Sequence, residues 1–160
     1  MVLDLARHYT DGPKPYYSIA FMLFSGEEAG LLGSTFYVNN PLFPLDQIKL
    51  VINLDMVMTG QDGVLLFNGT ARPNEAAIVQ KINEENQYMK NVENRDPLPQ
   101  SDHHPFHVKG VPAIFFLTKG ASGRGHTPDD TYDKLPLYAY ENFFKLVTEI
   151  PDELRKQEVR

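Results

Sequence analysis

The chain has 160 residues, of which 42% are hydrophobic and 11% aromatic, as is typical of one globular domain with its own core. Its formal net charge is −6, whereas proteins that bind nucleic acids or anionic membrane surfaces use basic patches. The chain has no cysteine, so a metal ion would be bound by Asp, Glu and His side chains. We therefore expect a single domain without a nucleic-acid partner and, since no apolar run approaches about 20 residues, without a membrane-spanning segment.

Apolar runs and turn residues predict alternating helices and strands along the chain. In chain order we expect a helix at 2–10, a strand at 17–24, a helix at 28–39, strands at 48–55 and 64–68, a helix at 74–90, a strand at 111–117 and a helix at 137–157. Segments 91–105 and 119–136 are rich in loop-forming residues. The strands are apolar throughout, which predicts a three-layer α/β/α domain around a mostly parallel mixed sheet.

Residues that bind metals follow three of the apolar runs. Glu27 and Glu28 follow the first run, Asp55 ends the second, and His126 lies in the loop after the last. Two adjacent carboxylates at the mouth of a buried strand repel each other and lose hydration, so they need a cation, a helix N-terminus or a proton. Because ligands of open α/β sheets bind at the carboxyl ends of strands, we expect these four side chains to converge at one edge.

Each of these residues also has a purely structural explanation. Glu27 and Glu28 are equally well explained as carboxylates at a helix N-terminus. For Asp55 taken alone, a capping role at the end of a strand is the better explanation, and His126 is compatible with a simple turn. The residue types alone leave both interpretations open.

Four segments together resemble, in order and spacing, the zinc aminopeptidases of metallopeptidase family twenty-eight. They are Phe24–Ser34, Ile52–Met56, Ser101–Phe106 with Gly110–Ala113, and Gly125–Leu135. The resemblance spans nearly the whole chain and implies the zinc-exopeptidase fold, which is of the phosphorylase/hydrolase type. Glutaminyl cyclases share this fold and much of the same pattern.

The resemblance also implies roles for individual residues. Members of the family hold two zinc ions through a His, a bridging Asp, a Glu, a second Asp and a final His. Glu28, Asp55 and His126 resemble the last three of these ligands. Glu27 resembles the general base, which takes a proton from water and delivers it to the leaving amine. Asp102 resembles a residue near the active site of the cyclases and is expected to orient a ligand or the substrate amine.

The first His and the bridging Asp of the family have no counterpart in this chain. They would precede Glu27, where the sequence has 26 residues and His8 as its single histidine, in a predicted helix. We therefore expect residues 1–160 to be the C-terminal part of a zinc-exopeptidase domain, incomplete at the N-terminus. Two zinc ions per intact domain would then be bound weakly or not at all by this chain, which is expected to be inactive alone. An uncovered sheet edge also predicts a homo-oligomer.

The resemblance implies that the intact parent removes N-terminal residues from peptides with a free N-terminus. The alternatives are a glutaminyl-peptide cyclotransferase and a non-catalytic binding domain with a degenerate metal site. The Glu-Glu segment looks closer to the peptidases. Family members are often secreted or periplasmic, which favours one of these locations.

Two further groups of residues allow less specific expectations. The histidines at 103, 104 and 107 are expected in a loop, where 104 and 107 would be solvated rather than ligands. Met56, Phe106, Phe115 and Phe116 are compatible with an apolar substrate pocket and equally with the core.

Overall fold

The computed structural model describes residues 1–120 and 126–158 of the chain. Its strands are β1 (Val51–Leu54), β2 (Val64–Phe67), β3 (Val92–Asn94) and β4 (Ala113–Thr118). Within the described residues they form one sheet in the order β1-β4-β2-β3. The pairs β1–β4 and β2–β3 are parallel, and β2–β4 is antiparallel. The predicted mixed, mostly parallel sheet is therefore confirmed.

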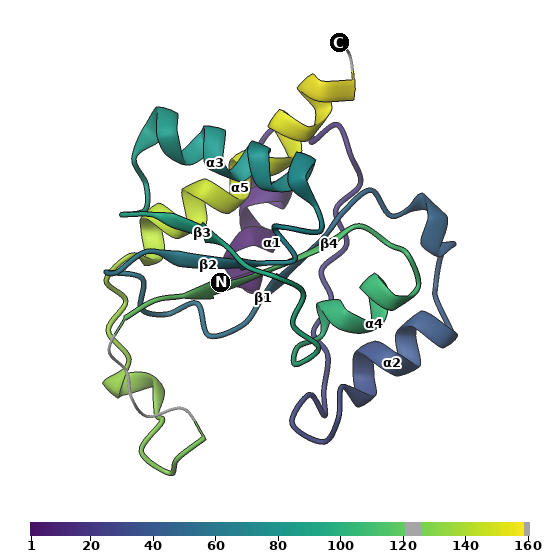
Figure 1. Cartoon of the computed structure of the whole chain (residues 1–160), viewed down its shortest axis with the longest axis horizontal. Helices are drawn as coiled ribbons and strands as arrows, with labels where there is room; N and C mark the ends of the chain where they lie inside the picture. Colours follow the sequence, from purple (N-terminus) through teal and green to yellow (C-terminus); the bar gives the residue numbers. More distant parts are fainter. Residues whose placement is uncertain (121–125, 159–160) are drawn as a thin grey trace.

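Helices cover both faces of the sheet, as Figure 1 shows. The helices are α1 (Val2–Asp11), α2 (Leu32–Asn39), α3 (Pro73–Asn86), α4 (His103–Val108) and α5 (Tyr140–Glu158). α1, α3 and α5 lie on one side, and α2 and α4 on the other (Figure 1). Two short 3₁₀ turns, Leu45–Gln47 and Tyr132–Lys134, complete the described elements. None of these helices combines the length and the apolar composition that crossing a membrane requires.

β4 is apolar from Ala113 to Leu117 because it contributes to packing on both faces. Ile114 and Phe116 enter the larger core, under α3 and α5, whereas Ala113 packs into the smaller core with Phe106 of α4. On the α4 side Phe115 stacks between the rings of Phe67 and His103. An alternating pattern would have left one of these faces polar.

The predicted strand at 17–24 is wrong. The trace that joins α1 to α2 runs beside the sheet without forming a strand (Figure 1, purple). No backbone hydrogen bond connects residues 18–24 to another described residue. An apolar run becomes a strand only when a neighbour satisfies its N–H and C=O groups, and here no strand lies against it.

Several element boundaries also differ from the sequence-based expectation. The predicted helix at 28–39 begins only at Leu32, because a tight turn precedes it. α3 ends at Asn86, where Gln87 takes the left-handed conformation that commonly ends helices. The segment 91–105, predicted as loop, contains β3 and the start of α4. α4 was missed because histidine and proline are weak helix formers, although proline fits a first helical turn.

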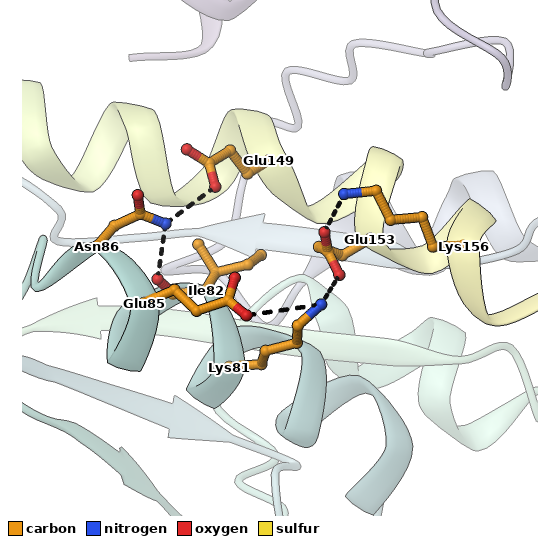
Figure 2. A network of polar contacts seen from close by, with 7 residues as sticks. All are labelled: Lys81, Ile82, Glu85, Asn86, Glu149, Glu153 and Lys156. Atoms are coloured by element: carbon orange, nitrogen blue, oxygen red, sulfur yellow. Dashed lines mark hydrogen bonds and ion pairs between the residues drawn. The ribbon is translucent and has the colours of Figure 1, made fainter.

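A network of charged side chains ties α3 to α5, as Figure 2 shows. Glu153 of α5 is only 9% exposed and accepts hydrogen bonds from Lys81 of α3, at 2.6 Å, and from Lys156. These hydrogen bonds, with Lys156 contributing most, lower the pKa of Glu153. Asn86 adds a hydrogen bond to Glu149 at 3.3 Å (Figure 2). The network fixes the position of α3 relative to α5. The apolar faces of both helices pack into the larger core.

Glu153→Gln should destabilise the chain by about 1 kcal/mol at pH 7, because both lysines lose their anionic partner. Because the pKa of Glu153 is lowered in the folded state, this stabilisation is fully present at pH values above the ordinary glutamate pKa of about 4.3. The stabilisation should be lost as the pH falls through the folded-state pKa. Urea unfolding at pH 7 and pH 3 tests this. Glu85→Gln is the matched control, since Glu85 lies 3.9 Å from Lys81 and is largely exposed. An equal loss in both variants would contradict the prediction.

Candidate active site

A tight turn presents the two adjacent glutamates. Gly26 has a φ of 70°, which glycine adopts at little cost, and its carbonyl accepts a hydrogen bond from the Leu32 N–H at 3.1 Å. The Leu31 N–H donates to the Glu27 carbonyl at 2.9 Å. Successive side chains in such a turn do not alternate between two faces as they do in a strand. Glu27 and Glu28 therefore both reach the carboxyl edge of the sheet.

The structure brings the five candidate residues together. His126 Nδ1 lies 3.3 Å from Glu28 Oε1, and both side chains are largely exposed. Partial burial raises the pKa of Glu27, and the charges of Glu28, Asp55 and Asp102 raise it further, while His126 lowers it. These groups act on Glu27 because they lie close to it. The expected convergence at one edge is thus observed.

Hydrogen bonds hold the two aspartates in place. Asn53 Nδ2 donates to Ser101 Oγ at 2.7 Å, and Ser101 Oγ donates to Asp55 Oδ2 at 2.9 Å. Ser34 Oγ, which is buried, donates to Asp102 Oδ1 at 2.5 Å. Neither serine was singled out as a site residue, although Ser101 directly precedes Asp102. The hydrogen-bond partners of both serines are distant in sequence. The only sequence signal for their roles was therefore the adjacent pair Ser101-Asp102 in a polar segment.

Two residues near the carboxylates have left-handed backbones. Met56, directly after Asp55, has a φ of 54°, and His126 has a φ of 61°. Both conformations are uncommon for residues other than glycine. Thr118 Oγ1 donates to the Met56 carbonyl at 2.9 Å and stabilises this turn. The Met56 side chain is 50% exposed, so it belongs to the surface of the site rather than to the core.

The expected loop position of the histidine cluster is wrong. His103 begins α4, is fully buried and stacks on Phe115 at 5.0 Å between ring centroids. Burial lowers its pKa to about 4, so the ring is neutral at neutral pH. His104 and His107 lie in the same helix and are half-buried rather than fully solvated. A short helix packed on β4 removes these residues from solvent, which the polar sequence did not predict.

The described residues fit a zinc site only in part. Two ligands of one tetrahedral zinc ion, each about 2.0 to 2.1 Å from the metal, lie roughly 3.3 Å apart. The distance of 3.3 Å between Glu28 and His126 matches this spacing. However, no group of three or more His, Asp or Glu side chains among the described residues is placed to hold one metal ion. The described residues therefore do not form a complete metal site.

A profile of Peptidase family M28 matches residues 1–150. The chain belongs to this family. Among curated proteins, this M28 chain is 27% identical over 121 residues to a probable leucine aminopeptidase 2 of Aspergillus oryzae. The matched region is 66% of this chain and 23% of that protein.

Solved structures agree with the M28 assignment. A zinc aminopeptidase from Bacillus subtilis matches with a TM-score of 0.78 and 26% identity, over 93% of this chain and 38% of its own. A Porphyromonas gingivalis glutaminyl cyclase matches with a TM-score of 0.72 and 18% identity, over 95% of this chain and 62% of its own, which shows a shared fold alone. The chain therefore spans less than two thirds of the length of each of these relatives.

The position of Glu27 predicts a stabilising variant. Because the folded-state pKa of Glu27 is raised, ionising this group costs folding free energy once the pH exceeds the unfolded-state value of about 4.3. Glu27→Gln should therefore raise the melting temperature at pH 7 to 8, and the gain should disappear below pH 4. Calorimetry across this pH range measures it, with Glu84→Gln, an exposed carboxylate on α3, as the control. A destabilised Glu27→Gln at pH 8 would contradict the electrostatic account.

Proposed function

We propose that the complete protein removes N-terminal residues from peptides and that this chain supplies its general base and part of its metal-ligand set. The observation that carries the proposal is the different environment of the two adjacent glutamates. Glu28 is exposed and lies against His126, whereas Glu27 is partly buried with a raised pKa. Perturbed pKa values are characteristic of groups that transfer protons at active sites. Membership of a peptidase family supports the same reaction class.

Glu27 is proposed as the general base and then the general acid. Its carboxylate takes a proton from a water molecule as the water oxygen attacks the carbonyl carbon of the first peptide bond. When the carbon–nitrogen bond breaks, Glu27 returns that proton to the leaving amine nitrogen. A raised pKa suits both steps, because it brings the protonated and ionised forms closer in free energy at neutral pH.

Glu28, His126 and Asp55 are proposed as zinc ligands, with zinc inferred from the relatives. Two zinc ions in the intact domain require further ligands beyond these three, so we propose that this chain alone binds zinc weakly and is inactive. The excess of carboxylates at the site favours a cationic group, which a substrate with a free N-terminal ammonium provides. Asp102, held by Ser34, is proposed to orient that ammonium.

Two other functions retain support from specific observations. The shared fold with a glutaminyl cyclase is compatible with cyclisation of N-terminal glutamine. The incomplete ligand set of the described residues is compatible with a non-catalytic binding domain. Homo-oligomerisation and a secreted or periplasmic location remain proposals that rest on the sequence alone.

Substitutions in the complete protein separate these functions. Glu27→Gln should retain zinc and lower kcat for a leucyl anilide by about 10²- to 10⁴-fold, the contribution of general acid–base catalysis. His126→Ala should lower the zinc content measured by elemental analysis. Glu84→Gln, far from the site in sequence and exposed, is the activity control.

Three outcomes would contradict the proposal. An active Glu27→Gln would remove the general-base assignment. Conversion of glutaminyl peptides to pyroglutamyl products in preference to hydrolysis would favour the cyclase. A zinc-loaded complete protein that turns over neither substrate would favour the binding domain.

A further inference from the structure

Asn68 lies directly after β2, at a turn that connects three elements of the fold. Its side chain is fully buried, and its Nδ2 donates to the Ala113 carbonyl at 2.9 Å. The β2–β4 ladder ends at Phe67 and Phe115. The Ala113 carbonyl lies beyond this ladder, so the Asn68 amide takes the place of a strand N–H. The Asn68 carbonyl accepts the N–H of Arg72 at 2.8 Å, just before α3.

The turn requires asparagine and then glycine, for two separate reasons. Asn68 has a φ of 64°, a left-handed conformation that asparagine adopts more readily than most residues. A glycine at this position would lack the amide that binds Ala113. At Gly69, a Cβ would lie 2.9 Å from the Leu66 carbonyl oxygen, which is too close for any side chain. The geometry of the turn therefore accounts for the sequence Asn-Gly.

Asparagine followed by glycine is a chemically labile pair, and this is the one such pair in the sequence. In an unfolded chain, the backbone nitrogen of Gly69 attacks Cγ of Asn68, because glycine has no side chain to obstruct the approach. The new bond closes a succinimide ring, the bond from Cγ to Nδ2 breaks, and Nδ2 leaves as ammonia with the proton of the Gly69 amide. Water then opens the ring at one of its two carbonyls and gives aspartate or isoaspartate.

The folded structure restrains both reacting groups. The Gly69 N–H donates to the Leu66 carbonyl at 3.2 Å, which holds the attacking nitrogen in the turn. The leaving nitrogen, Nδ2 of Asn68, is held by Ala113. Because Asn68 is fully buried, water does not reach the ring-opening step either. Deamidation at Asn68 therefore requires that this turn opens.

Neither product fits the folded turn. Oδ1 of Asn68 already lacks a partner among the described residues, and a second oxygen in place of Nδ2 would face the Ala113 carbonyl without a donor between them. A buried carboxylate without a partner is strongly destabilising. Isoaspartate adds a main-chain carbon before Gly69, so the bond from Gly69 to Leu66 could not form with the present geometry.

We propose that Asn68 is a deamidation site that folding keeps closed and unfolding opens. Its rate of modification follows the population of states in which the turn is open. Because the products no longer tie the end of β2 to the start of β4, deamidation converts reversible unfolding into permanent loss of the fold. The proposal does not depend on the peptidase function.

The first test compares the folded chain, the chain unfolded in guanidinium and a synthetic peptide of residues 65–71, all at pH 8 and 37 °C. Peptide mapping by mass spectrometry measures the conversion of the Asn68 amide to an acid over time. The unfolded chain and the peptide should deamidate at similar rates. The folded chain should be at least a hundredfold slower, because only its open states react.

Recovery of the fold provides an independent test. When the chain is held unfolded at pH 8 and then diluted into buffer, the native circular dichroism signal should fall in step with deamidation at Asn68. Asn68→Gly is the matched control, because glycine accepts a φ of 64° and carries no amide. Its recovery should not depend on the time spent unfolded.

If Asn68→Gly does not fold, the unmodified sequence held unfolded at pH 5 serves the same purpose. Loss of the Gly69 amide proton is rare there, so cyclisation is slow and recovery should stay constant.

Three results would overturn the proposal. A folded chain that deamidates as fast as the peptide would show that burial does not protect Asn68. Full recovery of the fold after complete deamidation would show that the turn accommodates the products. An equal loss of recovery in Asn68→Gly, or at pH 5, would assign the loss to another process.

Discussion

The position of β4 between β1 and β2 is the constraint on which the rest of the structure depends. Its side chains enter the core under α3 and α5 on one face and the core under α4 on the other. Its pairing with β1 also fixes the point where that strand ends, because the Asp55 N–H donates to the Phe116 carbonyl. The pairing of β1 with the central strand β4 thus places Asp55 at the carboxyl edge of the sheet.

A second constraint is the electrostatic cost of gathering four carboxylates at that edge. Burial and mutual repulsion raise the pKa of Glu27, and His126 offsets this only in part. A folded chain tolerates this cost when the cluster is kept for binding or catalysis, where stability is commonly lower than the fold could achieve. The same negative charge suits a metal ion or a substrate ammonium.

Local sequence patterns predicted the fold class and the convergence of Glu27, Glu28, Asp55 and His126, because each follows an apolar run that ends at the same edge. Patterns failed where the outcome depends on a distant partner. The apolar segment 17–24 lacks a neighbouring strand, so it forms none. Ser101 reaches Asp55 across 46 residues, and His103 is buried by packing against Phe115, neither of which local composition reveals.

We propose that this chain holds only part of a metal site, with Glu28 and His126 as one pair of ligands. The most direct measurement is the zinc content of the purified chain by elemental analysis after dialysis against metal-free buffer. We expect well below one zinc ion per chain, because two protein ligands bind zinc weakly compared with three or four. Retention of two zinc ions per chain would contradict this account and would mean that other residues complete the site.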